Sequence, residues 1–357
     1  MSATKPSNTT IDAVTLLKVL GLLLAILVHV YYGTKNFEFL RFQKLWVSMQ
    51  YGVQLLFLFG SYHVFKIGKK NNFNIPSLFK HTMGLYVAYV FIMGYYIWEN
   101  TITGRMVYPS LKDAVLDASL NLTLLQSVLP SICNGIVPGA WIASCFLLFS
   151  IIIYVLAHKI SSLEACLKFL LLTLLVRFLL VEILIPVMAN MYTFNLSYFV
   201  YANFFNHLPV FILGIIFYYC KQTSFKIVFF VTTSTFILTM LFLIQMAIGH
   251  SIFFPTHMQF ALAFVLMLLV ATPTNILNNR YFVVILKLFK SPTLVIYFCH
   301  FSMIFLLQKI GLFDMVASVY VSIALNYILT LIMTLLLAKF VTFLTTIIYP
   351  PCINLEA

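Results

Sequence analysis

Two ionisable residues stand in the first apolar segment of the chain: Lys18 and His29 begin and end the stretch KVLGLLLAILVH. An α-helix turns about 100° per residue, so a spacing of eleven puts both side chains on one face, about 16 Å apart along the axis. A lysine in hydrocarbon costs roughly 3 kcal/mol, so it needs a polar partner or a function. Lys18 could hold an anionic donor while His29 handles protons. Alternatively, Lys18 reaches the interface and His29 hydrogen-bonds within the bundle.

A second pair of charged residues, Arg177 and Glu182, lies in the apolar stretch LLVRFLLVEILIP. In an α-helix a spacing of five separates the two side chains by about 140° around the axis. We therefore expect them to be poor partners for each other and to find other polar groups. A structural ion-pair role is favoured over substrate binding for both residues.

Two further histidines lie in apolar segments, His207 in NFFNHLPVF and His300 in LVIYFCHFSMIF. A lone histidine in an apolar helix is more often a hydrogen-bonded packing residue than a catalyst. The segment ANMYTFNLSYFVYANFFNHLP is rich in amides and aromatic rings, which could stack on a sugar or form an aromatic belt at the membrane interface. The acceptor-binding candidates in this segment are Tyr192, Asn195, Tyr198 and Tyr201.

The composition sets the kind of element that must position these residues. The chain has 357 residues and is 62% hydrophobic but only 8% charged, too little charge to cover a water-soluble fold of this length. We therefore expect a polytopic membrane protein. The net charge of +12 falls between the apolar runs, which argues against nucleic acid as a partner. The six cysteines are scattered without metal-like spacing, so we expect neither a disulfide framework nor a metal site.

Apolar runs of membrane-spanning length recur about ten times along the chain. They fall near residues 13–32, 46–65, 81–98, 140–157, 166–188, 205–219, 227–247, 255–272, 293–307 and 315–345. The last run is long enough for one tilted helix or two helices. The sequence thus predicts an all-α transmembrane helical bundle of about ten spans, forming a single domain over residues 1–357.

The charges between the runs predict the orientation of the bundle. Lysine and arginine are more frequent in the loops on the side of the N-terminus, so the positive-inside bias places both termini in the cytoplasm. The longest outer loop, residues 99–139, contains SLKDAVLDASLNLTLLQSVL. Its helical periodicity and Ser110 as an N-cap candidate predict an interfacial or re-entrant helix.

In their order along the chain, these segments resemble the acyltransferase 3 family of integral membrane acyltransferases. The family's Arg-x10-His pattern in the first span reads Lys18-x10-His29 here. The second span, GVQLLFLFGSYHVF, is similar to the family's G-V-D-x-F-F-x-x-S-G-Y, with Gln54 in place of the acid.

Three later segments are similar to family motifs as well, so the resemblance covers nearly the whole chain. GAWIASCFLLF resembles W-x-L-S-V-E-x-x-F through Trp141 and Ser144. HLPVFILGI resembles L-P-x-F-x-x-G. SPTLVIYFCH resembles S-x-x-x-x-x-Y-L-x-H through Tyr297 and His300.

The resemblance implies an O-acyltransferase, most often an O-acetyltransferase, in a bacterial inner membrane. It would move an acyl group from cytoplasmic acetyl-CoA, or another acyl-CoA, to a hydroxyl of an extracytoplasmic glycan such as lipopolysaccharide O-antigen or capsule. Acyl-CoA would be a donor substrate rather than a permanently bound cofactor. The partners would be the lipid bilayer, the donor and the surface polysaccharide or its lipid-linked precursor.

The candidate residues divide by role under this interpretation. The roles are catalytic for His29 and Lys18, donor-binding for Lys80, Tyr297 and His300, and tunnel-lining or structural for Trp141, Ser144, Arg177 and Glu182. A transporter or flippase for a lipid-linked or anionic substrate is an alternative, with charged side chains lining its path. A non-catalytic partner subunit is another.

Overall fold

The computed structural model describes residues 13–34, 52–103, 110–132, 135–157, 159–191, 196–220, 288–289, 293–315 and 318–349. This part of the chain is helical, with no strand in it. The helices are α1 (Ala13–Gly33), α3 (Gly52–Lys70), α4 (Ile75–Thr103), α5 (Leu111–Leu122), α6 (Trp141–Leu156), α7 (Leu163–Arg177), the π-helix η4 (Phe178–Leu184), α8 (Ile185–Met191), α9 (Leu196–Ala202), α10 (Phe204–Cys220), α14 (Thr293–Lys309) and α15 (Val319–Ile348). Short 3-10 turns occupy Pro130–Ile132 and Leu312–Asp314.

The apolar helices are those of a membrane protein. Within the described ranges, four stretches are long and apolar enough to cross a membrane: Val14–Gly33, Leu163–Met188, Tyr198–Cys220 and Val319–Ile348. Two shorter helices, α6 and α14, are also apolar. The spans expected at 227–247 and 255–272, and the start of the one at 46–65, lie outside the described residues.

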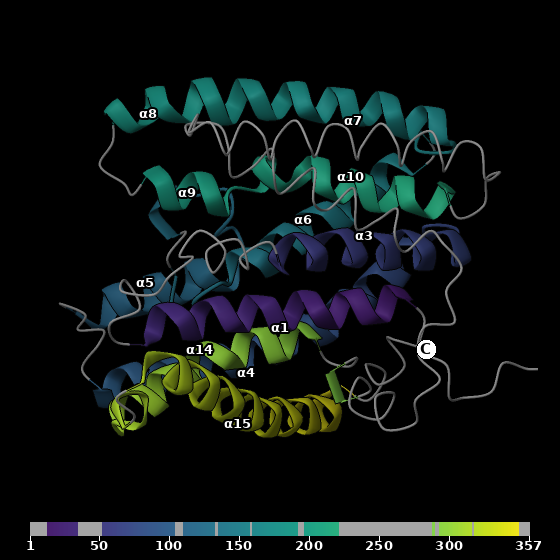
Figure 1. The fold of residues 1–357 in the computed structure, drawn as a ribbon. Helices are drawn as coiled ribbons and strands as arrows, with labels where there is room; N and C mark the ends of the chain where they lie inside the picture. Colours follow the sequence, from purple (N-terminus) through teal and green to yellow (C-terminus); the bar gives the residue numbers. More distant parts are fainter. Residues whose placement is uncertain are drawn as a thin grey trace, which may run out of the picture.

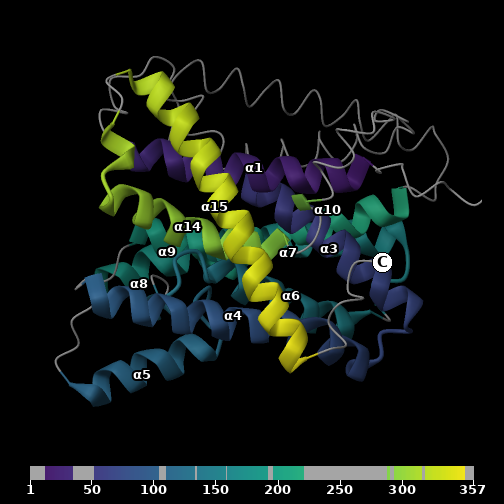
Figure 2. The ribbon, with the colours of Figure 1, turned by 90° about the horizontal axis from the view of Figure 1, so that it is seen from below.

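The last predicted span is one continuous helix rather than two. α15 holds 30 residues, which at 1.5 Å per residue is about 45 Å long. The hydrocarbon core of a bilayer is about 30 Å thick, so a helix of this length must tilt to keep its apolar residues in lipid. Figure 2 shows α15 crossing the other helices obliquely.

The helices are stacked so that some are enclosed and others lie at the edge. Figure 1 shows α7 and α8 at one side of the bundle and α15 at the other, with α10, α3, α1 and α14 between them. Of the span Tyr198–Cys220, 83% is buried in the protein, compared with 22% of Leu163–Met188 and 22% of Val319–Ile348. The outer helices expose large apolar side chains such as Leu171 and Leu336, as expected for a surface that faces lipid.

Small residues allow the central helices to approach closely. A Cβ atom added at Gly21 of α1 would lie 2.7 Å from the Gly52 carbonyl oxygen and 2.8 Å from the Leu55 Cβ atom of α3. Both distances are too short for any side chain, so a glycine is required where these two helices cross. Close packing over small residues is a main source of helix association in membranes.

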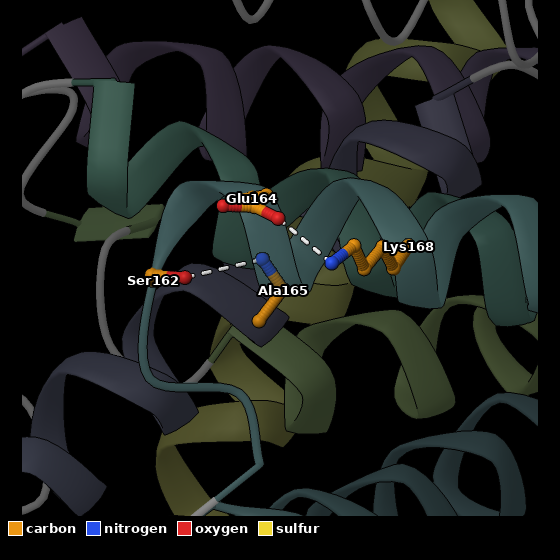
Figure 3. Close-up of polar contacts among 4 residues, drawn as sticks. All are labelled: Ser162, Glu164, Ala165 and Lys168. Carbon is orange, nitrogen blue, oxygen red and sulfur yellow. Dashed lines mark hydrogen bonds and ion pairs between the residues drawn. The ribbon is translucent and has the colours of Figure 1, made fainter.

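Two helices outside the core begin at serine N-caps. The Ser110 hydroxyl accepts a hydrogen bond from the Asp113 backbone N–H (3.3 Å), so the helix and cap expected in the outer loop are confirmed. α7 begins in the same way, because the Ser162 hydroxyl accepts from the Ala165 N–H at 3.1 Å (Figure 3). These side chains satisfy N–H groups that have no partner within the helix.

Beside the second cap, Glu164 and Lys168 form an exposed i,i+4 ion pair at 2.7 Å (Figure 3). An ion pair in water at a helix end adds little stability. The Glu164 carboxylate does stabilise the N-terminus of α7 through its interaction with the helix dipole.

Candidate functional site

The structure brings His29 of α1 beside His300 of α14. Their ring centroids are 5.2 Å apart, and the His29 ring is also 4.3 Å from the ring of Phe301. The register of the two helices is held by Gln308, whose side-chain N–H donates to the Gly33 carbonyl oxygen (2.8 Å). His300 is fully buried and His29 is partly buried. Two imidazoles that are far apart in the sequence are therefore in contact inside the bundle.

His300 is held through one ring nitrogen only. Its Nδ1 is hydrogen-bonded to the Tyr297 carbonyl oxygen, three residues earlier on α14. A carbonyl can only accept, so Nδ1 carries the hydrogen and Nε2 keeps its lone pair. Nε2 is buried and has no hydrogen-bond partner in the described part of the chain. A histidine oriented through one nitrogen, with a free lone pair on the other, is arranged to act as a base.

Tyr297 and Gly139 close one side of this pair. The buried Tyr297 ring lies 5.0 Å from the His300 ring. Gly139 precedes α6 with a positive φ of 76°, and a Cβ there would lie 2.8 Å from Tyr297 Cε1 and 3.1 Å from Phe301 Cε2. The left-handed backbone and the lack of space both require glycine at this position.

Two of the predicted acceptor-binding tyrosines lie near the same place. Tyr198 and Tyr201 are partly buried and pack against the same apolar core that contains Tyr297. The other two candidates, Tyr192 and Asn195, lie outside the described residues.

His207 of α10 forms a second histidine centre, in which both ring nitrogens are bonded. Nε2 lies 2.6 Å from the Tyr201 carbonyl oxygen, and Nδ1 lies 3.3 Å from the Gln54 side-chain nitrogen. The ring is stacked on Trp141, with centroids 5.1 Å apart and 20° between the planes. His207 is hydrogen-bonded at both nitrogens and stacked, as expected of a packing residue. His300 meets this expectation in part, because its Nδ1 is bonded but its Nε2 has no partner among the described residues.

Trp141 and Ser144 occupy neighbouring turns of α6 and are both buried. Trp141 contacts the Tyr201 ring edge-on at 5.1 Å, in addition to its stacking on His207. The Ser144 hydroxyl lies 2.6 Å from that of Ser127 and accepts from the Ser127 backbone N–H at 3.2 Å. These contacts join the segment before α6 and the segment before α10 to α6, which supports the structural half of the role expected for both residues.

The expectation that Arg177 and Glu182 are poor partners is wrong. Arg177 Nη2 lies 2.9 Å from Glu182 Oε1, in a largely buried ion pair. The reason is that the backbone from Phe178 to Leu184 is a π-helix, whose i→i+5 hydrogen bonds bring residues five apart onto one side. Arg177 Nε also donates to Asn206 Oδ1 of α10 (3.1 Å), which joins the ion pair to that helix, as the favoured structural role would require.

The two candidate lysines, Lys18 with a predicted catalytic role and Lys80 with a predicted donor-binding role, do not lie at the histidine pair. Lys18 is partly buried on α1, about 16 Å along the axis from His29. Lys80 is exposed on α4, while Tyr96 of the same helix donates to the Phe298 carbonyl oxygen (3.1 Å) beside the pair. The spacing places Lys80 about 24 Å along α4 from that level. Any donor that touched Lys80 and His29 would therefore have to be long.

Sequence reasoning gave no role to three residues that shape the two centres, namely Gln54, Gly139 and Phe301. Gln54 was noted only where the family motif has an acid, although a polar residue among apolar neighbours indicates a hydrogen-bond partner. Gly139 follows a proline, which signals a turn. Phe301 gives no signal among the many phenylalanines of the chain.

No group of three or more His, Cys, Asp or Glu residues suited to a metal ion occurs in the described ranges. Comparisons with protein families, with curated proteins and with solved structures return no match for this chain. The interpretation of the site therefore depends on the chemistry of its residues and on the motifs of the sequence.

Proposed function

We propose that this chain is a membrane O-acyltransferase that transfers an acyl group, most often acetyl, from acyl-CoA to a hydroxyl of an extracytoplasmic glycan. The observation that carries the proposal is the contact between His29 and His300, whose Nε2 has no hydrogen-bond partner among the residues that the structure describes. An imidazole with a free nitrogen in a water-poor interior is suited to take a proton from a hydroxyl. The motif resemblance points to the same reaction.

The reaction needs one base and no redox step. The base, His300 Nε2 or the adjacent His29, takes the proton of the acceptor hydroxyl as that oxygen attacks the thioester carbonyl carbon. The bond from the carbonyl carbon to sulfur breaks, and the CoA thiolate leaves with the proton returned by the imidazole. His29 is the more exposed of the two rings, so it is the group that meets the substrates. Tyr297 and the tyrosines near it line the acceptor side.

The proposed orientation places both termini in the cytoplasm of a bacterial inner membrane, with about ten spans. It is supported by a basic end of the bundle, where the ends of α3, α6 and α10 meet. Tyr219 donates to the Ile160 carbonyl oxygen (2.9 Å), and the rings of Phe73 and Tyr154 lie 5.4 Å apart. The lysines on or beside these helix ends and the first turns of α4 and α7 are Lys66, Lys69, Lys70, Lys80, Lys159 and Lys168. This end would receive the phosphates of the donor.

The test is turnover by the purified chain in liposomes with labelled acetyl-CoA and an oligosaccharide acceptor. Ester formation is expected for the natural chain and is expected to be lost in His29→Ala. His63→Ala, which changes a partly buried histidine of α3 away from the pair, is the matched control. Full ester formation by folded His29→Ala would remove His29 from the mechanism. No turnover by the natural chain would favour a non-catalytic partner subunit.

One observation favours transport as a second candidate. The buried ion pair of Arg177 and Glu182 sits at a π-helix, a feature found often at functional sites. In cells lacking a transporter, glycan export would fail and the lipid-linked precursor would accumulate. Normal export with unesterified glycan would instead support the acyltransferase.

A further inference from the structure

On one side of α15, the residues at every fourth position are buried, and most of them are polar; we call this row the polar stripe. Its buried positions include Ser322, Asn326, Thr330, Thr334 and Ala338, and this side of the helix packs against α14, α1 and α4. Residues four apart lie on one side of an α-helix. The rest of α15 is mostly apolar and exposed. The polar groups therefore face the interior of the protein.

Three consecutive members of the stripe carry polar atoms that nothing in the described part of the chain satisfies. These atoms are Asn326 Oδ1, Thr330 Oγ1 and Thr334 Oγ1. Asn326 is 1% exposed, and both threonines are 0% exposed. The Asn326 amide nitrogen donates to the Ser322 hydroxyl (3.1 Å), which fixes the amide and leaves its oxygen free to accept. Burying such groups without partners lowers stability, so a function has to account for them.

The same helix shows that unsatisfied threonines are not a general feature of α15. Nearer its C-terminus, Thr342 donates to the Ala338 carbonyl oxygen (2.7 Å) and Thr345 donates to that of Val341 (2.8 Å). This bond to the preceding turn is the ordinary solution for threonine in a membrane helix. Thr330 and Thr334 do not make it and have no partner among the described residues, so their hydroxyls can bind a ligand.

The stripe begins at a depth midway between Lys18 and His29 and continues toward the level of Lys18. Tyr327 of α15 donates to the Leu23 carbonyl oxygen of α1 (3.0 Å), and Leu23 stands midway between those two residues. Ile323 packs on Tyr31 farther along α1, so the helices run in opposite directions. The stretch from Asn326 to Thr334 covers about 12 Å of the α15 axis.

We propose that Asn326, Thr330 and Thr334 bind the pantetheine arm of the acyl-CoA donor as it passes toward the histidine pair. The inference rests on the proposed acyltransferase function and adds to it the surface that recognises the donor. The arm is neutral and has two amides, whose nitrogens are about 5 Å apart by ordinary bond lengths. Successive positions of the stripe are about 6 Å apart. Asn326 Oδ1 can accept from an amide N–H, and the threonine hydroxyls can donate to amide oxygens.

The experiment compares two double variants of the full chain in detergent. T330V/T334V removes the two free hydroxyls with little change of shape, and T342V/T345V removes two that are already bonded. Binding of acetyl-CoA is measured beside binding of adenosine 3′,5′-bisphosphate, which lacks the arm. The dissociation constant of acetyl-CoA is expected to rise about tenfold or more in T330V/T334V only, at about fivefold for each of the two hydrogen bonds of ordinary strength that are lost. That of the bisphosphate is expected to stay the same in both variants.

The remaining results would overturn the inference in distinguishable ways. If T330V/T334V binds acetyl-CoA as tightly as the natural chain, the stripe serves helix packing only, while the proposed acyltransferase stands. An equal loss for both probes, or an equal loss in T342V/T345V, would indicate general damage to the bundle and no recognition of the arm. If the natural chain does not bind acetyl-CoA, the proposed function itself fails and this inference fails with it.

Discussion

The two histidine centres of the bundle are built from similar parts but differ in what they leave free. His207 bonds through both nitrogens, to the Tyr201 carbonyl oxygen and to Gln54, and its ring is stacked on Trp141. His300 bonds only through Nδ1, to a carbonyl of its own helix, and its other nitrogen has no partner among the described residues.

This difference indicates different roles for His207 and His300, which both lie in apolar segments of the sequence. A histidine with both nitrogens bonded in a dry interior contributes to packing and has no lone pair left to accept a proton. Burying a histidine with one unbonded nitrogen beside a second imidazole lowers the stability of the folded protein. Such a cost is typical of catalytic sites. The centre of His29 and His300 is therefore the candidate for catalysis, and that of His207 is the candidate for support.

The largest expected effect is on activity, from His300→Asn. The asparagine amide can still donate to the Tyr297 carbonyl oxygen, but the variant lacks the free Nε2. General-base catalysis supplies about 10²–10⁴-fold in rate, so ester formation should fall by at least about 100-fold. Turnover of labelled acetyl-CoA checks this, together with the melting temperature of the variant. Activity that survives in a well-folded His300→Asn protein would make the two centres functionally equal.

Arg177→Met should give the largest loss of stability. It leaves the Glu182 carboxylate buried without its partner and removes the donor to Asn206, next to His207. Breaking a buried pair from one side costs about 3–5 kcal/mol, whereas replacing both partners is often neutral. Unfolding in detergent should therefore show that R177M/E182L recovers most of the stability lost in Arg177→Met. A double variant as unstable as the single one would mean that the π-helix itself requires the charges.

His207→Phe should lower stability by about 2–3 kcal/mol and leave the rate per folded molecule largely unchanged. The aromatic ring keeps the stacking on Trp141, but two buried hydrogen bonds disappear and the Tyr201 carbonyl oxygen loses its donor. Denaturation curves and turnover of the same preparation test this. A stable His207→Phe protein with abolished turnover would reverse the roles assigned to the two centres.

Gly139→Ala is expected to have the smallest effect, about 1–3 kcal/mol from the left-handed backbone. The added methyl group would also push on the Tyr297 and Phe301 rings beside the histidine pair, so turnover should fall with stability. Gly94→Ala is the control, because nothing lies within 4 Å of a Cβ added there. Equal behaviour of both variants would separate Gly139 from the catalytic centre.

The helices themselves could be predicted from the sequence. The apolar run at 13–32 is α1, the run at 205–219 is α10, and Ser110 caps the helix expected in the outer loop. These features depend on local chemistry, namely apolar length and a side-chain oxygen beside free N–H groups. The ion pair of Arg177 and Glu182 could not be predicted, because sequence reasoning assumed an α-helix where the backbone forms a π-helix.

The sequence by itself determined that this is a helical membrane protein with a lysine and a histidine on its first apolar helix. Only the tertiary structure decided that, among the described residues, His207 is bonded through both ring nitrogens and His300 through one. The partners that satisfy His207 come from α3 and α9, and His29 meets His300 across some 270 residues of sequence. Hydrogen bonds between distant segments are fixed by how the helices pack, and no local pattern of residues encodes that packing.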